Sequence, residues 1–144
     1  MFLSNTFYSS YPIKSNYEIK KKLASYPLDA NFLRTVIKPL SPDIRTWHYN
    51  VECDDAVHRI YRLSPISRES HGISMHVGSQ WFIISREFAE YLAKTSVGSL
   101  VHQYLQYAEH VVVADENFFG TIIRNTEFCA KHHNDNFLHL HFDR

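Results

Sequence analysis

The chain has 144 residues, of which 44% are hydrophobic, 15% aromatic and 21% charged, and its 15 basic and 15 acidic side chains leave no net charge. This length predicts one domain, and 10 Phe, 9 Tyr and 2 Trp exclude a disordered chain. The balanced charge gives no indication of a nucleic-acid partner. No run approaches the ~18 apolar residues of a membrane-spanning helix, so we expect no membrane contact by this segment itself.

The first half of the chain predicts one helix and three strands. Ser15 and Glu18 have the spacing of a capping box, and the helix that they begin should end near Pro27. The predicted strands and the turn and loop between them are, in chain order, a β-rich run at 32–37, a strand at 46–52, a turn at 54–55, a strand at 58–63 and a loop at 64–79.

The second half alternates between strands and helices, which favours an α/β fold over a bundle or a sandwich. Its predicted elements are an apolar strand at 81–84, a helix capped by Ser85, a helix after Gly98, a buried strand at 111–114, a helix capped by Asp115 and an alternating strand at 137–142. Cys53 and Cys129 are too few for a disulfide framework, and they could either pair or remain thiols.

A carboxylate pair stands where the strand at 111–114 is expected to turn into a helix. Ligands bind at the carboxyl ends of strands in open α/β sheets, so Glu116 is a candidate general base there. The alternative is that Asp115 only caps the helix and that Glu116 complements the helix dipole.

Histidines gather near the C-terminus and could form a metal site. His139 and His141 would lie about 7 Å apart on one face of a strand, and His132 or His133 could complete the site. A third ligand at a defined spacing is missing, so polar histidines on a half-exposed strand are the alternative. A small His-ligated metalloprotein is one of the functional hypotheses that the sequence leaves open.

A third candidate is the run Gly78-Ser79-Gln80-Trp81. Gly78 allows the backbone to approach a ligand closely, the Trp81 indole can stack on a sugar ring, and Ser79 or Gln80 can bond sugar hydroxyls. The alternative is that Trp81 begins a strand as an ordinary core residue.

Three blocks together resemble the core-2/I-branching N-acetylglucosaminyltransferase and peptide O-xylosyltransferase superfamily, glycosyltransferase family 14. Residues 11–19 resemble its Phe/Tyr-Pro-Ile segment that opens a helix. Residues 78–88 resemble its Gly-Ser-x-aromatic strand and Ser-Arg helix start. Asp115 to Phe119 with Thr121 resemble its Asp-Glu segment, and 136–144 resemble the strand beyond.

The resemblance implies the C-terminal portion of a GT-A-like glycosyltransferase domain, with a mixed sheet and flanking helices. It also implies inverting transfer of N-acetylglucosamine or xylose from a UDP-sugar to a glycan or protein hydroxyl. Glu116 would be the catalytic base, and Gly78, Ser79, Gln80, Trp81 and Asp115 would bind substrate. No metal cofactor is expected, and the family works on the lumenal side of the Golgi.

We further expect residues 1–144 to be one partial catalytic domain that lacks nucleotide-binding strands at one end and the family's C-terminal end at the other. Such a piece alone should transfer no sugar. A truncated or degenerate relative that binds glycans or partners without catalysis is the alternative function.

Overall fold

The computed structural model describes residues 2–4, 12–37, 48–62, 72–109 and 113–138. Their strands form a four-stranded sheet of order β1-β5-β2-β6 and a separate hairpin, β3-β4. The elements are β1 (Phe2–Ser4), α1 (Asn16–Leu23), β2 (Asn31–Ile37), β3 (His48–Cys53), β4 (Ala56–Arg62), β5 (His76–Ser85), α3 (Arg86–Ala93), α4 (Leu100–Ala108), α5 (Asp115–Arg124), the 3-10 helix η1 (Glu127–Lys131) and β6 (His132–His133).

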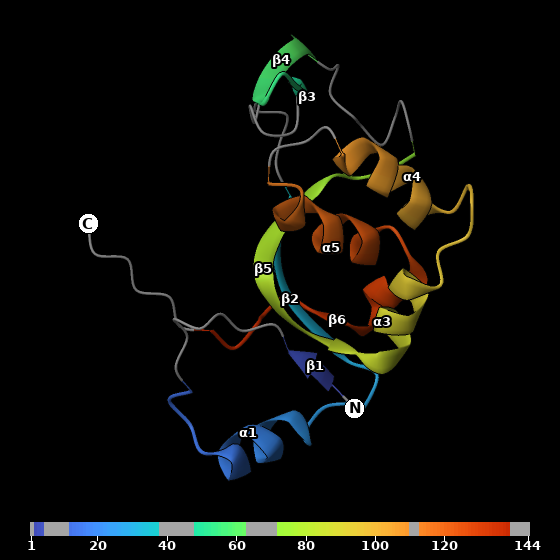
Figure 1. The fold of residues 1–144 in the computed structure, drawn as a ribbon. Coiled ribbons are helices and arrows are strands. Elements are labelled where there is room, and N and C mark those ends of the chain that lie inside the picture. The colour runs from blue at the N-terminus through green and yellow to red at the C-terminus, as the bar shows by residue number, and fades with distance from the viewer. Residues whose placement is uncertain (1, 5–11, 38–47, 63–71, 110–112, 139–144) are drawn as a thin grey trace.

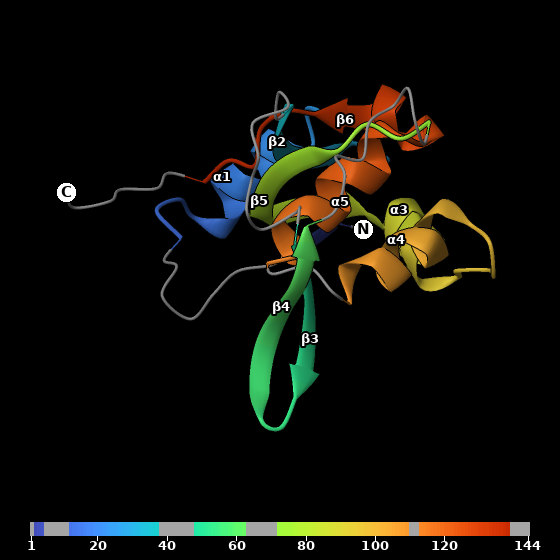
Figure 2. The same cartoon turned by 90° about the horizontal axis from the view of Figure 1, so that it is seen from above.

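The sheet is mixed, because β5 runs antiparallel to β1 and β2 whereas β6 runs parallel to β2. Helices α3, α4 and α5 lie on one side of the strongly curved strand β5 (Figures 1 and 2). The core lies between these helices and the sheet, and its buried members are Leu33, Ile84, Phe88, Val101, Tyr104, Ile122, Ile123 and Phe128. The described residues therefore confirm an α/β arrangement with a mixed sheet and flanking helices.

Aromatic rings cover the opposite face of the sheet. Phe32 and Leu33 are neighbours on β2, so their side chains point to opposite faces, and Leu33 belongs to the helix-side core. The Phe32 ring stacks on His133 with centroids 5.1 Å apart and contacts Tyr26 and Phe137 at 4.9 Å each. Tyr26 follows α1 and so attaches that helix to the sheet.

Serine caps begin three helices, and the sequence predicts two of these caps, Ser15 and Ser85. The Ser15 hydroxyl accepts from the Glu18 N–H at 3.3 Å, and Glu18 Oε2 accepts from the Ser15 N–H at 2.9 Å, which confirms the capping box. Ser85 and Ser99 cap α3 and α4 in the same way. Helix α1 ends at Leu23, earlier than the proline would require, and buries none of its side chains.

The turn of the β3-β4 hairpin lies where the sequence predicts it. Asp54 and Asp55 have φ angles of 52° and 59°, which confirms the expected turn as a two-residue connection of the primed type. Positions 46, 47 and 63, which the sequence also predicts as strand, lie outside the described residues.

Cys53 and Cys129 are both free thiols. None of the helices described is long and apolar enough to cross a membrane.

Four expectations were wrong within the described residues. The loop at 64–79 gives way to strand at His76, because pairing with β2 satisfies the backbone of this polar segment. Val113 has a φ of 59° and stands in a turn, not a strand, and the N-cap of α5 is Ala114 without a side-chain bond, so Asp115 is the first helical residue. Phe137 has a φ of 55° and begins no strand, whereas residues 111–112 and 139–142 lie outside the description.

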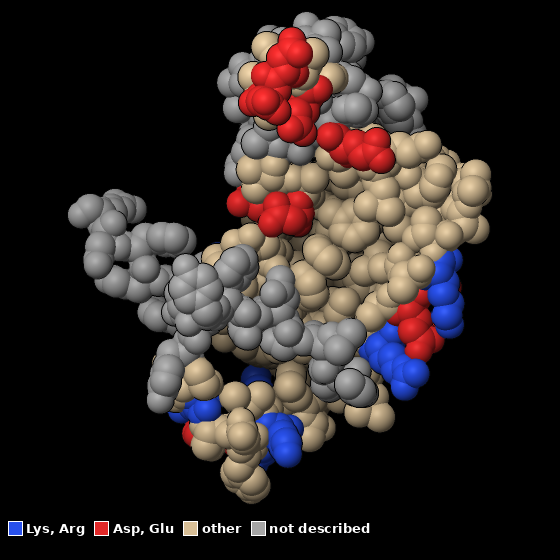
Figure 3. Space-filling view, in the orientation of Figure 1, with Lys and Arg blue, Asp and Glu red and all other residues tan. Residues whose placement is uncertain are grey.

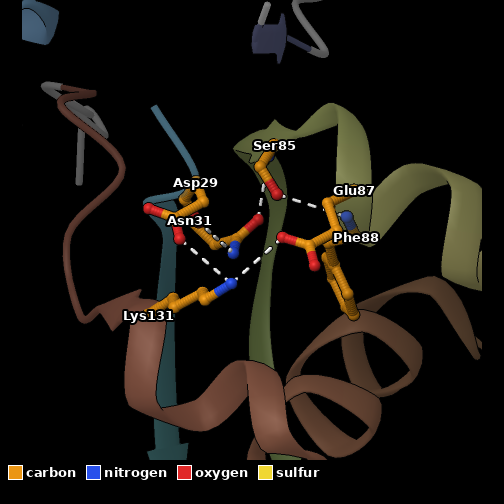
Figure 4. Close-up of polar contacts among 6 residues, drawn as sticks. All are labelled: Asp29, Asn31, Ser85, Glu87, Phe88 and Lys131. Atoms are coloured by element: carbon orange, nitrogen blue, oxygen red, sulfur yellow. Dashed lines mark hydrogen bonds and ion pairs between the residues drawn. The ribbon is translucent and has the colours of Figure 1, made fainter. Parts of the chain in front are cut away.

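A polar junction joins the start of β2 to the start of α3 (Figure 4). The buried Asn31 carboxamide accepts from the Ser85 N–H at 2.8 Å and donates to the Asp29 carbonyl at 3.1 Å. Lys131 from η1 reaches both Asp29 and Glu87 at 3.0 Å. This junction fixes where β5 ends and α3 begins, and so helps to place the segment 78–85.

Candidate functional site

Glu116 lies in the first turn of α5, on the stripe of the helix that faces the sheet. Residues three, four and seven positions apart share one helix face, and Phe119 and Gly120 follow Glu116 at these spacings. The Phe119 ring lies 4.1 Å from the Phe82 ring of β5. A Cβ on Gly120 would lie 3.5 Å from His76 Cβ, so the helix touches the sheet here. Accordingly Glu116 is half-buried, whereas Asp115 beside it is exposed.

A polar stripe along α5 holds this helix on the strand. The Thr121 hydroxyl accepts from the His76 N–H at 3.1 Å and donates to the His76 carbonyl at 3.2 Å. One turn further, Asn125 accepts from the Ser74 N–H at 2.8 Å and donates to the Ser74 carbonyl at 2.7 Å. These side chains pair with the backbone leading into β5 much as a neighbouring strand would, so the helix has one defined position.

Gly78 is a close-packing position in the centre of the sheet. A Cβ placed there would lie 3.0 Å from the Arg34 carbonyl oxygen and 3.6 Å from the Thr35 methyl carbon. A Cβ on Gly120 would lie 3.3 Å from the same methyl carbon. The two glycines thus approach Thr35 from β5 and α5, which lets the helix sit close to the strand that carries residues 78–81.

Ser79, Gln80 and Trp81 form a bulge in β5. Thr35 pairs with Gly78 and Leu33 pairs with Phe82, so three residues of β5 lie opposite the single residue Arg34. The Ser79 hydroxyl accepts from the Trp81 N–H at 3.1 Å within the bulge. Bulges redirect side chains and are frequent beside active sites, so this irregularity fits a binding segment.

Asn136 ties the bulge to the segment after β6. Its buried amide donates to the Ser79 hydroxyl at 3.0 Å and to the Trp81 carbonyl at 3.3 Å. Its own oxygen accepts from the Leu138 N–H at 3.3 Å. The structure therefore brings Ser79 and Trp81 together with Asn136, and places Gly78 on the α5 side with the helix that begins at Asp115 and Glu116.

Acidic side chains dominate one region of the surface. Glu52, Asp54 and Asp55 of the hairpin are exposed, and Asp115 and Glu116 stand in the first turn of α5. Figure 3 shows acidic side chains in the upper part of this face, while the Lys and Arg side chains drawn there lie in its lower part. Glu116 is thus one of two adjacent carboxylates in the first turn of α5.

Two of the described histidines, His76 and His132, are packed into the fold. His132 Nε2 lies 2.7 Å from the Leu33 carbonyl, and burial is the largest cause that lowers the pKa of both His132 and His76. No group of three metal-ligating side chains occurs within the described part of the chain, and positions 139 and 141 lie outside it.

A pocket of about 380 Å³ lies elsewhere, between α3, the start of α4 and η1. Glu87, Tyr91, Ser99 and Phe128 are among its lining residues, and none of the six candidate site residues belongs to it. The candidate site is thus an arrangement around the β5 bulge and the start of α5, separate from this pocket.

The sequence reasoning assigned no site role to Asn117, Thr121 or Asn136, although all three lie in segments that carry the family resemblance. All three are buried polar residues. The available signal was the four-residue spacing of polar residues 117, 121 and 125, which places them on one stripe of the helix. Asn136 had no local signal, because its partners lie 55 and 57 residues away.

Comparison with known proteins supports the resemblance. The family model described as Core-2/I-Branching enzyme matches residues 2–144. Xylosyltransferase 1 of Rattus norvegicus is 31% identical over 131 residues, which cover 89% of this chain and 15% of that protein. Xylosyltransferase 2 of Mus musculus is 33% identical over 137 residues, which cover 90% of this chain and 15% of that protein.

A third relative comes from the branching enzymes. The beta-1,3-galactosyl-O-glycosyl-glycoprotein beta-1,6-N-acetylglucosaminyltransferase 4 of Mus musculus is 29% identical over 128 residues, covering 85% of this chain and 27% of that protein. The chain therefore spans between 15% and 27% of the length of these three relatives. Since the family model extends over nearly every residue, the chain belongs to the Core-2/I-branching enzyme family of glycosyltransferases.

Proposed function

We propose that this chain is the acceptor-side part of an inverting glycosyltransferase that uses a UDP-sugar. The donated sugar is xylose or N-acetylglucosamine, as in the names of the relatives, and the acceptor is a hydroxyl of a glycan or a glycoprotein. In this proposal the domain has the GT-A fold, and Glu116 is the catalytic base.

One observation carries the proposal: the two most specific family segments meet in space. Phe119 and Gly120, one turn after Glu116, contact Phe82 and His76, which flank residues 78–81 on both sides. Glu116, the proposed base, thus lies in the first turn of the helix that packs beside residues 78–81, the segment expected to bind the acceptor. Proton transfer needs a base within hydrogen-bond reach of the bound hydroxyl, and the packing of these two segments supports the proposal.

The chemistry follows from these positions. The acceptor hydroxyl attacks the anomeric carbon from the side opposite the UDP leaving group, and the bond to the diphosphate breaks. Glu116 accepts the hydroxyl proton as the new glycosidic bond forms, which raises the nucleophilicity of the oxygen during the attack. Trp81 offers an aromatic surface for a sugar ring, and Ser79 and Gln80 offer hydrogen bonds to its hydroxyls.

Glu116→Gln in the complete protein that contains these residues is the direct test. Gln keeps the size of the side chain but cannot accept the proton, so turnover should fall about 10²-fold or more while donor binding persists. Glu109→Gln, an exposed carboxylate at the end of α4, is the matched control and should leave turnover unchanged. Full activity in Glu116→Gln would remove Glu116 as the base. Glycan binding without turnover in the native protein would favour the non-catalytic alternative.

We also propose, from the family resemblance, that transfer needs no metal ion and takes place on the lumenal side of the Golgi. Transfer that persists in excess EDTA is the expected result for the first point. Dependence on added Mn²⁺ or Mg²⁺ would contradict it. Localisation of the tagged complete protein tests the second point.

A further inference from the structure

The backbone immediately before α5 is strained at a position where strain is unusual. Val113 has a φ of 59°, in the left-handed region. A β-branched residue rarely adopts this conformation, because its Cβ comes too close to the backbone. The turn at 113–114 therefore does not hold itself, and the surrounding structure must impose it.

Two hydrogen bonds to the Val113 carbonyl stabilise this turn. This carbonyl accepts the Glu116 N–H at 3.3 Å and the Asn117 side-chain amide at 3.4 Å. The Asn117 side chain belongs to a residue that is only 3% exposed, so water does not readily reach this donor, whereas Val113 itself is 39% exposed. The same carbonyl thus links the candidate base to a buried amide.

Asn117 is also the first residue of the polar stripe along α5. Thr121 and Asn125, four and eight residues later, bond the backbone of His76 and Ser74. These two residues anchor the middle and the end of the helix to the strand. Asn117 extends the stripe to the turn that precedes the helix, where neither of the other two reaches.

We propose that Asn117 is a positioning residue, which holds the first turn of α5 and thereby Glu116 through the Val113 carbonyl. This role rests on the proposed function of Glu116 as the base. Asn117 does not touch substrate in this scheme. It limits the orientations open to the Glu116 backbone, so that the carboxylate keeps one position relative to the β5 bulge.

A pair of isosteric substitutions isolates the hydrogen bond. A Thr hydroxyl at 117 can donate to the carbonyl four residues earlier, which is Val113, whereas Val has the same shape and no donor. In the 144-residue chain, Asn117→Val should speed hydrogen exchange of the Glu116 amide by about tenfold or more, and Asn117→Thr should speed it much less. The Phe118 amide, which bonds Ala114 at 2.9 Å, is the internal control and should exchange at one rate in both variants.

Equal exchange of the Glu116 amide in Asn117→Val, Asn117→Thr and the parent chain would overturn the proposal. If Asn117→Val does not fold, Asn117→Ala and Asn117→Ser make the same comparison with smaller side chains. In the complete protein, Asn117→Val should lower kcat by about tenfold at an unchanged donor KM, and Asn117→Thr should recover part of that loss.

The two proposals fail in different ways. If Glu116→Gln keeps full turnover, the base assignment is lost, while the exchange measurement still decides whether Asn117 holds the turn. If Glu116→Gln is inactive but Asn117→Val and Asn117→Thr have the same kcat, Glu116 remains the base and the positioning role of Asn117 is rejected.

Discussion

The Thr121 hydroxyl and the His76 backbone exchange two hydrogen bonds, one in each direction, across 45 residues of sequence. Both residues are buried, and Gly120 beside Thr121 lies against the His76 side chain. The exchange fixes the height and rotation of α5 on β5 at one point. Because Glu116 lies on the same helix, this contact contributes to the position of the candidate base.

Removing the Thr121 hydroxyl should therefore destabilise the fold. Thr121→Val keeps the shape but leaves the N–H and the carbonyl of His76 buried without a partner, and we expect a loss of about 1–3 kcal/mol in the free energy of unfolding. Thr126→Val is the control, since its hydroxyl bonds carbonyls only three and four residues earlier, in the last turn of α5, and the residue is half-buried. Urea denaturation measures both, and equal losses would contradict the special role of the His76 contact.

Asn31 should matter more to stability than the ion pairs around it. Asn31→Leu removes the acceptor of the buried Ser85 N–H, so we expect a loss of about 1–3 kcal/mol. Lys131→Met removes two ion pairs of a partly exposed ammonium group, which solvent screens, and should change the unfolding midpoint much less. A larger effect of Lys131→Met than of Asn31→Leu would reverse this ranking.

Gly78→Ala separates a packing role from a binding role. The new Cβ would lie 3.0 Å from a backbone oxygen, so strand and bulge must shift, and we expect a lower unfolding midpoint. Gly120→Ala is the companion variant, since its Cβ would meet a side-chain methyl carbon at 3.3 Å, an easier group to displace. Unchanged stability with weaker acceptor binding in Gly78→Ala would instead favour a ligand contact at Gly78.

Stability should decrease in mild acid because of His76 and His132. Burial lowers the pKa of His76 from its ordinary 6.5, and Arg124 and His132 lower it further by charge repulsion. Burial likewise lowers the pKa of His132, opposed by its bond to the Leu33 carbonyl and supported by Arg124 and His133. The unfolded chain then binds more protons, so this stability is complete above pH 6.5 and is lost as pH falls towards the folded pKa values.

His76→Phe tests this pH dependence, because it removes one of the two titrating groups. The difference in free energy of unfolding between pH 7.5 and pH 5 should shrink in this variant. His58→Phe, at an exposed position on the hairpin, should leave that difference unchanged. The same pH dependence in His76→Phe and the parent chain would show that His76 does not contribute.

A different kind of titration concerns the tyrosines of α4. Burial raises the pKa of Tyr107 to about 12, and it raises the pKa of Tyr104 beyond its usual range as well. Spectroscopic titration in alkali should therefore show at least two tyrosines that ionise only at high pH or on unfolding. If all tyrosines ionised near pH 10 in the folded chain, the burial of these two would be wrong.

Local signals predicted the parts of the fold that depend on neighbouring residues. The serine caps at 15 and 85 and the Asp54–Asp55 turn are confirmed because their hydrogen bonds close within a few residues. The strand at 31–37 is confirmed within one residue, since its β-branched and aromatic side chains suit a pleated, buried surface. The segments that resemble the family could likewise be recognised from the sequence, since each is a run of neighbouring residues.

Errors arose where distant segments decide the backbone. The β5 strand begins at His76 because β2 pairs with a stretch that looks like a loop. The turn at Val113 contradicts the strand propensity of valine, and its carbonyl bonds explain how the conformation persists. Asn136 joined the site only through partners more than 50 residues away.

The sequence by itself determined the α/β class, the helix starts at Ser15 and Ser85, the hairpin turn and membership of the Core-2/I-branching enzyme family. Each of these follows from residues close together in the chain. Only the tertiary structure decided that Ser79 to Trp81 form a bulge opposite Arg34, and that α5 packs on the flanks of that bulge with Glu116 on its inner stripe. The reason is physical: such positions are set by packing and by hydrogen bonds between segments 45 residues or more apart, which no local pattern encodes.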